Sequence, residues 1–518
     1  MTSYNLVNGV HAANSAALCT AIARCEWGFA GIFMTDWDTT SSRRCTAEGC
    51  IQAGNDLLMP GNRREYSALL CALRDGWTAS CCAAVPGGSS KRRWGSPPPQ
   101  RPDQTTRAAI TYKEVFTTMD TEKLRSWQSW IRTELESSVN FWLKNGMDPE
   151  HGGIYTCLTR EGKVFSTDKS VWMQGRCGWI FAHMCRLYGT RPEWLEASRS
   201  CLDFMEDHCI NRSAGNRMYF TVTADGKPLR QRRYCFSEEF YAIANAEYYG
   251  ITGDRKCLER ARRAYQLVYD LNHGAPDPTG LGPKTIPETR KGRALADPMI
   301  FLNMTSVLRR VDPEQAALYD QYSAQCVHDI FAYHHKPDLH CTLESVGMNG
   351  EFQSDISAGR VVNPGHDIEC SWFLMEEANR IGSRDLHRKA EDVFRFAINA
   401  GWDQEYGGLL YFIDCMGLPP EAYEHDMKLW WPHNEILIAS LMAYRDTRDE
   451  TYLDWFYKTI AYCRDHFADP AYGEWYGYLR RDGKPTLPAC KGSTFKGPFR
   501  VPRSLSMADK LIDEILAP

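Results

Sequence analysis

Five segments of the sequence place ionisable or indole side chains where a helix is expected to begin. They are VWMQGR with Trp172 and Arg176, CFSEEFY with Glu238, NPGHDIE with His366 and Glu369, WWPHNE with Trp431, His433 and Glu435, and FKGPFRVPR with Arg500. Imidazole exchanges protons near pH 7, guanidinium and carboxylate groups bind oxygen atoms, and indole faces stack on sugar rings. A site that contained all of these groups could move a proton on a carbohydrate.

Each segment alone has a plainer explanation. A histidine at the start of a helix is more often a structural group than a catalyst, and Arg176 or Glu435 could cap a helix or form a local ion pair. The hypothesis of a site therefore depends on whether the fold brings the five segments to one place.

Apolar residues recur at spacings of three and four from about residue 120 onward, which predicts amphipathic helices. In the first helix these residues are Leu124, Trp127, Ile131, Leu135, Val139 and Trp142. Together with glycine, proline and Asp-Pro breaks, the pattern predicts twelve helices, which begin near residues 120, 171, 192, 236, 254, 297, 313, 366, 384, 433, 449 and 503.

The connections between these helices alternate between short and long. The short ones lie at Gly189–Arg191, at 251–253, near Asp312 and at 382–383. The long ones contain turn signals, namely Glu161-Gly162, Asp225-Gly226 and Asp482-Gly483, which predict short β-hairpins. The related segments DPEHGGIY, DQEYGGLLYF and DPAYGEWYGYL indicate a repeated structural unit.

In a chain of antiparallel helices, successive connections lie at opposite ends, so all the long loops must lie at the same end. We therefore expect a mainly α fold, an (α/α)6 barrel with short β-hairpins in its long loops. The five segments would then begin alternate helices around the loop-covered mouth. An open α-solenoid is the competing architecture, although its loops should be more uniform in length.

Composition limits the class of protein. A chain of 518 residues with 43% hydrophobic content can bury a large core, and its formal charge of −5 gives no reason to expect nucleic acid or a membrane as partner. We find no membrane-span or signal-peptide pattern and expect a cytoplasmic protein. The 20 cysteines form no CxxC pair or metal-ligand cluster, so we expect reduced thiols and no metal.

The beginning of the chain differs from the rest. Residues 1–74 predict a small α/β fragment, and SYNLVNG, CEWGFAGIFMTDW and AGNDLLMPG resemble the barrel domain of family-3 glycoside hydrolases. The resemblance implies that Asp36 occupies the nucleophile position. A second carboxylate and a closed pocket are needed for hydrolysis, so we expect Asp36 to be vestigial. Residues 75–110, rich in Pro, Gly, Ser and Arg, predict a disordered linker, and the change after LRDG suits an out-of-frame gene junction.

Residues 111–518 resemble the N-acylglucosamine 2-epimerase family, which includes the renin-binding proteins. The resemblance is carried by EHGGIYTCLTREGKV, VWMQGR, NPGHDIE, MKLWWPHNE, DPAYGEWYGYL and FKGPFRVPR. It implies a sugar 2-epimerase in which His366 is an acid–base group and Arg176, Glu369 and Glu435 belong to the active site. Trp172 and Trp431 would hold the sugar ring. From their places at predicted helix beginnings, Glu238 and His433 are further candidates for contacts to the substrate.

The sequence departs from this family pattern at Arg500, where the resemblance implies a second catalytic histidine. Arginine stays protonated at physiological pH and cannot accept a proton from carbon. Three hypotheses remain open. The chain is a weakened epimerase, His433 takes the second role, or His366 alone removes and returns the proton.

The resemblance implies interconversion of N-acetylglucosamine and N-acetylmannosamine. The alternatives are epimerisation or isomerisation of an unacylated sugar such as mannose, glucose or cellobiose, and a catalytically silent barrel that binds sugar or protein. No cofactor is required by the chemistry. Because family members are often stimulated by ATP, the resemblance implies ATP as an allosteric effector, and a homodimer is an assembly that the sequence leaves open.

Overall fold

The computed structural model describes residues 112–517 without a break and, before them, residues 6–7, 10–11, 15, 19, 50 and 53. Contacts divide the chain into two units, Met1–Arg107 and Ala108–Pro518. In the first unit, β1 (Leu6–Val7) pairs antiparallel with β2 (Val10–His11). The predictions for Asp36 and for the linker 75–110 lie outside the described residues.

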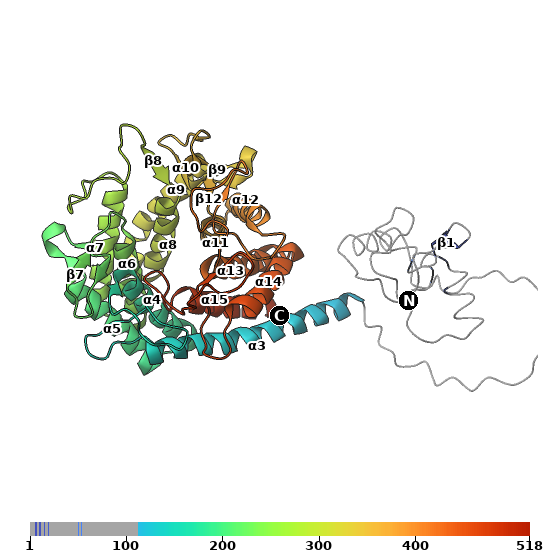
Figure 1. Cartoon of the computed structure of the whole chain (residues 1–518), viewed down its shortest axis with the longest axis horizontal. Helices are drawn as coiled ribbons and strands as arrows, with labels where there is room; N and C mark the ends of the chain where they lie inside the picture. The colour runs from blue at the N-terminus through green and yellow to red at the C-terminus, as the bar shows by residue number, and fades with distance from the viewer. Residues whose placement is uncertain are drawn as a thin grey trace, which may run out of the picture. The chain divides into compact units, whose positions relative to one another are not determined.

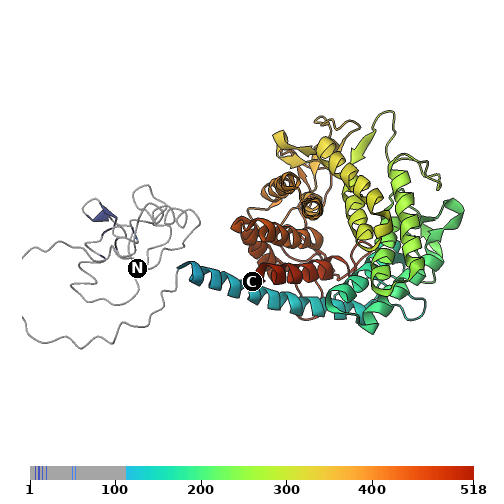
Figure 2. The same ribbon diagram turned by 180° about the vertical axis from the view of Figure 1, so that it is seen from behind.

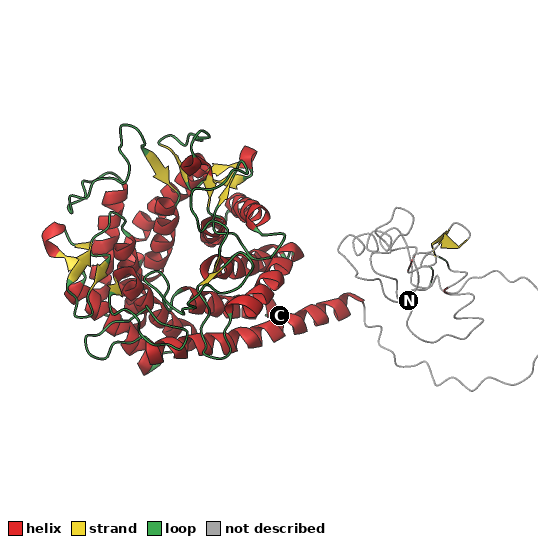
Figure 3. Cartoon of the chain, in the orientation of Figure 1, coloured by secondary structure: helices red, strands yellow, loops and turns green. Residues whose placement is uncertain are grey.

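The second unit is mainly helical, as Figures 1 and 3 show. Its twelve long helices, counted within the described residues, are α3 (Tyr112–Asn145), α4 (Val171–Tyr188), α5 (Pro192–His208), α6 (Phe236–Thr252), α7 (Arg255–Asn272), α8 (Ala296–Val311), α9 (Ala316–Asp329), α11 (Pro364–Ile381), α12 (Arg384–Gly401), α13 (Trp430–Thr447), α14 (Glu450–Tyr462) and α15 (Arg500–Leu516). The predicted helix starts are confirmed to within a few residues, except that α3 begins at Tyr112 and not near residue 120.

Alternate helices form a closed inner ring, which can be followed in Figures 1 and 2. The contacts run from α4 to α6, α8, α11, α13 and α15, and then from α15 back to α4. Each inner helix also packs most extensively against one outer helix, in the pairs α4–α5, α6–α7, α8–α9, α11–α12, α13–α14 and α15–α3. Because the ring closes, the (α/α)6 barrel is confirmed and the open solenoid is excluded.

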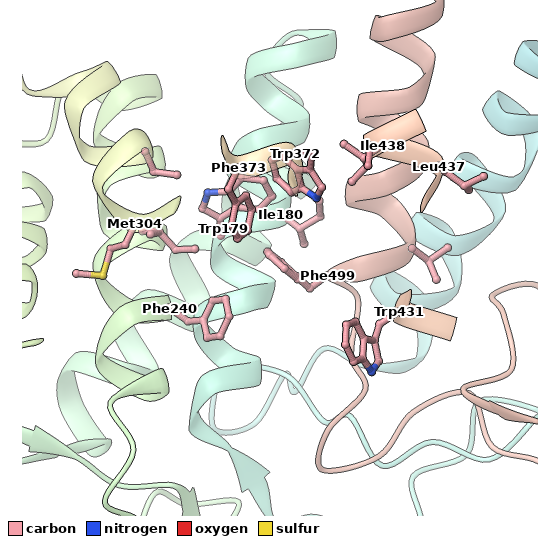
Figure 4. Packing of buried hydrophobic residues seen from close by; sticks show 14 of the residues in the cluster. Trp179, Ile180, Phe240, Met304, Trp372, Phe373, Trp431, Leu437, Ile438 and Phe499 are labelled. Atoms are coloured by element: carbon pink, nitrogen blue, oxygen red, sulfur yellow. The ribbon is translucent and has the colours of Figure 1, made fainter. Parts of the chain in front are cut away.

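Burial distinguishes the inner helices from the outer ones. In the inner helix α13 every residue from Trp430 to Ala443 is buried. In the outer helix α12 the buried residues recur at helical spacing and leave one face in water; they are Leu386, Ala390, Val393, Phe394, Ala397, Ile398 and Gly401. Side chains from all six inner helices therefore build the core at the centre of the ring. Figure 4 shows several of these side chains.

Short strands lie in the long loops. They are β3 (Lys169–Ser170), β4 (Ile210–Asn211), β5 (Arg217–Met218), β6 (Thr221–Val222), β7 (Pro228–Arg230), β8 (Gly292–Ala294), β9 (His335–Lys336), β10 (Cys341–Thr342), β11 (Ser345–Gly347), β12 (Val361–Val362), β13 (Ile413–Asp414), β14 (Lys428–Leu429) and β15 (Tyr478–Leu479). Short helical segments accompany them, namely η4 (Arg212–Ala214), η5 (Pro313–Gln315), η6 (Ile330–His334), η7 (Pro337–Leu339), α10 (Ser357–Arg360) and η8 (Cys463–Phe467).

The predicted hairpins are present at their turn signals. The turn at Gly226 connects β6 to β7, and the turns at Gly162 and Gly483 close the bridges Leu158↔Val164 and Leu479↔Pro485. Other pairs join different long loops, which the sequence did not indicate. β3 pairs with β6, β8 with β11, β12 with β13 and β14 with β15, all antiparallel. These pairs link neighbouring loops into a common rim.

The repeated segments are held by one recurring arrangement. In each, an aspartate accepts hydrogen bonds from backbone N–H groups of the following turn and receives the ammonium group of a lysine with no exposed side-chain surface. The pairs are Asp148–Lys169 at 2.7 Å, Asp403–Lys428 at 2.8 Å and Asp469–Lys491 at 2.9 Å. The predicted repetition of one structural unit is therefore confirmed at the level of side-chain contacts.

Among the described residues, no helix combines the length and the apolar character needed to cross a bilayer.

Candidate active site

A cavity of about 600 Å³ lies at the N-terminal ends of the inner helices. Polar groups from five of the six inner helices line it, and α13 adds an indole; they are Arg176 of α4, Glu239 of α6, Asn303 of α8, His366 and Glu369 of α11, Trp431 of α13, and Arg500 and Arg503 of α15. Tyr411, Glu424 and Met427 from the loop before α13 complete the wall together with Tyr478 and Phe495. The structure thus brings the beginnings of the six inner helices to one cavity beneath the long loops.

His366 lines this cavity and is oriented by Glu344. Asn363 caps α11 by accepting a hydrogen bond from the backbone N–H of His366 at 3.2 Å. Nδ1 of His366 lies 3.0 Å from Oε2 of Glu344, so Nδ1–H donates to the carboxylate and Nε2 is the nitrogen available to a ligand. Burial lowers the pKa of His366, but the Glu344 carboxylate outweighs burial and the net pKa is raised.

Arg500 begins α15 and binds two carboxylates. Its Nη1 lies 2.7 Å from Oε1 of Glu369 and also donates to Oε1 of Glu435. Arg503, one turn later, donates to the same oxygen of Glu435, whose other oxygen accepts from Nε1 of Trp372 at 2.9 Å. Burial lowers the pKa of Arg500, but the two carboxylates outweigh burial and raise the pKa above its usual value. Arg500 is therefore a permanent cation in the cavity wall.

The guanidinium group of Arg176 faces the cavity without a carboxylate partner among the described residues. Its Nε is buried and has no hydrogen-bond partner, and Cζ lies 4.2 Å from the ring centroid of Phe240. Burial lowers the pKa of Arg176 far below its usual value, and the cations Arg500 and Arg503 add to this effect. Negative charge on a bound ligand would stabilise this guanidinium group.

Two tryptophans form part of the wall. Trp172 donates weakly from Nε1 to the backbone oxygen of Thr494 at 3.4 Å. The ring of Trp431 lies 5.2 Å from the ring of His366 and 4.9 Å from Cζ of Arg500. Both indoles are therefore placed where a sugar ring in the cavity could stack on them.

The family model of N-acylglucosamine 2-epimerase (GlcNAc 2-epimerase) matches residues 153–495. The chain belongs to the N-acylglucosamine 2-epimerase family. It is similar to the N-acylglucosamine 2-epimerase of Rattus norvegicus, with 38% identity over 402 residues that cover 76% of this chain and 94% of that protein. The predicted resemblance is confirmed.

Two further comparisons concern the fold and a short stretch of the chain. The solved cellobiose 2-epimerase of Bacillus thermoamylovorans B4167 superposes with a TM-score of 0.65 and 20% identity, over 74% of this chain and 99% of that chain, which shows the shared fold. A separate match of 64 residues at 48% identity joins the chain to the probable beta-glucosidase J of Emericella nidulans. It covers 12% of this chain and 7% of that protein, and the assignment of residues 1–74 to a glycoside hydrolase fragment stays a prediction.

Within this 2-epimerase family member, Glu435 supports the site from behind the wall. Its side chain has no exposed surface, and it contacts Arg500 and Arg503 without lining the cavity. The predicted set of His366, Arg176, Glu369 and Glu435 is thus gathered in one region, with Glu435 one layer below the other three.

The structure corrects the placement of Glu238. This side chain is buried outside the cavity wall, where Oε1 accepts from Nε of Arg217 and from the backbone N–H of Met218, each at 2.7 Å. The neighbouring Glu239 lines the cavity in its place. Successive residues of a helix point about 100° apart. Glu238 therefore faces Arg217 outside the cavity wall, whereas Glu239, one position later, faces the cavity.

The structure also corrects the placement of His433. Nε2 accepts from the backbone N–H of Leu409 at 2.9 Å, and Nδ1–H donates to the backbone oxygen of Leu429 at 2.7 Å. The ring stacks on Tyr462 and has no exposed surface. Burial lowers the pKa of His433 to about 3. Both nitrogens are engaged in the fold away from the cavity, so the hypothesis that His433 replaces the second histidine is wrong.

Several groups in and behind the cavity wall were not predicted from the sequence, and three of them bear on the chemistry. Arg503 lies three residues after Arg500 and so shares its helical face, a signal that was present in FKGPFRVPR. Glu239 is adjacent to Glu238 in the first turn of α6, and the sequence contains no signal for which of the two glutamates faces the cavity. Glu344 lies in the loop before α11, 22 residues from His366, and no periodic pattern connects the two.

Proposed function

We propose that this chain interconverts N-acetylglucosamine and N-acetylmannosamine by proton transfer at C2 through an enolate of the open-chain aldehyde. The observation that carries the proposal is His366, oriented by Glu344, in the wall of a cavity that is also lined by Arg176, whose buried Nε has no hydrogen-bond partner among the described residues. The name of the rat relative supports an acylated amino sugar as substrate.

Proton transfer at C2 begins from the open-chain aldehyde, whose carbonyl group makes the neighbouring C–H bond acidic. With Nδ1–H bonded to Glu344, neutral His366 presents the lone pair of Nε2 to that proton. The carboxylate partner also stabilises the imidazolium that forms, because it raises the pKa of His366.

The negative charge that develops on O1 needs a donor in the wall. Arg176 supplies it, because this guanidinium group is already desolvated and forms no ion pair within 4 Å among the described residues, while Glu369 and Glu435 act on it only from a distance. Glu369 fixes Arg500 and also faces the cavity, where its remaining lone pairs can accept sugar hydroxyl groups. These roles involve proton transfer and hydrogen bonding only, so they require no redox cofactor.

A neutral, unacylated sugar is the second candidate substrate. It is favoured by the similarity to the cellobiose 2-epimerase of Bacteroides fragilis, which is 24% identical over 376 residues, 69% of this chain and 92% of that protein. A silent sugar-binding barrel is the third candidate, because Arg500 removes the predicted second imidazole. Stimulation by ATP and a homodimeric state stay predictions.

Incubation of the protein with each sugar in heavy water tests the proposal. We expect deuterium at C2 of N-acetylglucosamine and the formation of N-acetylmannosamine, followed by mass spectrometry and proton NMR. Deuterium at C2 of mannose or cellobiose alone would identify the second candidate. Heat of binding for N-acetylglucosamine without deuterium incorporation would identify a silent barrel and contradict the proposal.

A further inference from the structure

Glu239 lines the cavity and has a carboxyl oxygen without a hydrogen-bond partner among the described residues. The residue lies in the first turn of α6, lines the cavity wall and is only 3% exposed. Its Oε2 is buried and has no hydrogen-bond partner among the described residues. A buried polar atom without a partner destabilises the fold unless a ligand or water bonds to it, so such an atom in a cavity wall points to a functional role.

The surroundings of Glu239 favour its protonated form. Burial raises the pKa of the carboxyl group well above its ordinary value, and the carboxylates of Asp297 and Glu238 add to the rise. Arg176 is the neighbouring cation and opposes the rise without cancelling it. Burial in the cavity wall therefore favours the form of this carboxyl group that can donate a proton to a bound molecule.

The position of Glu239 in the ring matches that of Arg500. The inner helices follow one another as α4, α6, α8, α11, α13 and α15. From α11, which carries His366, α6 is reached in two steps in one direction and α15 in two steps in the other. Glu239 and Arg500 therefore each lie two helices away from His366 in the ring, on opposite sides of α11, and Glu239 is a titratable group where Arg500 is a permanent cation.

Resting on the proposed function, we propose that Glu239 is the second acid–base group of this chain and exchanges a proton with C2 on the face opposite His366. The substrate class is an open-chain 2-epimerisable aldose, and no additional reactant is needed. Glu239, on α6 of the inner helix ring, then performs the proton transfer that an imidazole at position 500 would otherwise perform.

The proton balance of one turnover is complete. Nε2 of His366 forms a bond to the C2 proton, and the C–H electrons form the C1=C2 bond while the carbonyl electrons move to O1. The C1=C2 electrons then form a new C2–H bond with the proton of Glu239 as the carbonyl group reforms. The turnover leaves an imidazolium and a carboxylate, and exchange with water or a turnover in the reverse direction restores the starting state.

The test compares three variants with the wild type in heavy water, with deuterium at C2 read separately in each epimer. In Glu239→Gln, which keeps the size and hydrogen-bonding capacity of the side chain, we expect interconversion to fall by roughly 10²- to 10⁴-fold. Exchange should continue in the one epimer whose C2 proton faces His366. In His366→Gln, exchange should continue only in the other epimer, so the two patterns are complementary.

Glu238→Gln is the matched control, because Glu238 is the adjacent carboxylate and lies outside the cavity wall. It should show a lower melting temperature through the loss of its bond to Arg217 and an unchanged exchange pattern. Interconversion by Glu239→Gln at the wild-type rate, or loss of exchange in both epimers, would overturn the assignment of Glu239 and leave the proposed function standing. A wild type without exchange in any sugar would overturn both.

Discussion

Nη1 of Arg500 lies 2.7 Å from Oε1 of Glu369, and the same guanidinium group donates to Glu435. Arg503 binds the same oxygen of Glu435, so two cations compensate two carboxylates in a buried cluster. This arrangement explains how an arginine is accommodated where the family resemblance predicts an imidazole. The additional charge is neutralised inside the wall, and the cavity remains open.

Arg500→His should increase the rate of N-acetylmannosamine formation. An imidazole at this position adds a group that can accept or donate a proton near pH 7, so the gain over the wild type, in which Glu239 supplies the second proton transfer, should be up to roughly 10²-fold. Arg503 would still pair with Glu369 and Glu435, so the fold should survive. Initial rates measured by coupled assay or NMR provide the check.

Arg500→Lys is the control for this variant, because it keeps the charge and adds no base at neutral pH. If Glu239 is the second acid–base group, the double variant Arg500→His with Glu239→Gln should keep its activity, since the new imidazole makes Glu239 dispensable. A rate for Arg500→His no higher than that of the wild type would contradict the interpretation that Arg500 weakens catalysis.

Glu344→Gln should shift the acid limb of the pH–rate profile to lower pH. The base form of His366 is the neutral imidazole, and Glu344 raises its pKa against the opposing effect of burial. In the wild type, activity is therefore gained only as the pH rises above about 6.5, the ordinary value for histidine. Without the carboxylate, burial dominates and the neutral form persists at lower pH.

Glu344→Gln should also lower the activity on the plateau of the pH–rate profile by roughly 10²-fold, because the imidazole of His366 is no longer oriented by a carboxylate. Glu351→Gln is the control, since Glu351 is an exposed loop carboxylate bonded to Asn349. It should leave the profile unchanged. A Glu344→Gln profile with the wild-type acid limb would show that another group controls the pH dependence.

The fold could be predicted from the sequence because its signals are local. Apolar spacing, glycine and proline breaks and alternating loop lengths determine helices, hairpins and the end of the bundle that carries the long loops. The positions of Arg176, His366 and Glu369 followed from these signals, since each lies in the first turns of an inner helix. The pairing of strands between different long loops could not be predicted, because it depends on contacts distant in sequence.

The side of an inner helix that faces the cavity was harder to predict. Helix α13 is buried on all faces from Trp430 to Ala443, and α6 is buried from Ser237 to Tyr248. The apolar pattern therefore contains no information about which face is the cavity face. That is why Glu238 was selected in place of Glu239, and why His433 was placed at the mouth.

His433→Phe should reduce stability without changing catalysis. The imidazole accepts from the N–H of Leu409 and donates to the oxygen of Leu429, and phenylalanine leaves both backbone groups unpaired. The loss should be roughly 1–3 kcal/mol in the free energy of unfolding. Urea denaturation measures the stability, and C2 exchange well below the melting temperature measures the catalysis.

The pH dependence of stability provides a second measurement on His433. Its folded-state pKa of about 3 lies below the unfolded value of about 6.5, so the folded state loses stability as the pH falls from 6.5 towards 3. His433→Phe should lose less stability over this range than the wild type does. Loss of C2 exchange at undiminished stability would show instead that His433 takes part in the reaction.

Lys169→Met should strongly destabilise the barrel. The ammonium group donates to Asp148 and to the backbone oxygens of Gly152 and Ala224, and the lysine side chain has no exposed surface. Its removal leaves a buried carboxylate without its charge partner, which costs about 3–5 kcal/mol. Urea denaturation at pH 7 should show the difference as a lower midpoint.

The control is Lys227→Met, which removes a lysine bonded to an aspartate at a similar distance, 2.8 Å, but 77% exposed. Water already solvates that pair, so no measurable change is expected.

The pH dependence of stability separates the two lysine–aspartate pairs further. Burial raises the pKa of Asp148, but Lys169 and the backbone N–H groups outweigh burial and lower it to about 2. The wild type therefore keeps this contribution above about pH 3.8, the unfolded value, and loses it as the pH falls towards 2. In Lys169→Met the pKa of Asp148 rises towards or above its unfolded value. The free energy of unfolding of this variant should therefore fall less than that of the wild type when the pH is lowered from about 3.8 to 2. Equal urea midpoints for Lys169→Met and Lys227→Met would mean that the repeated lysine–aspartate pairs do not hold the loops to the barrel.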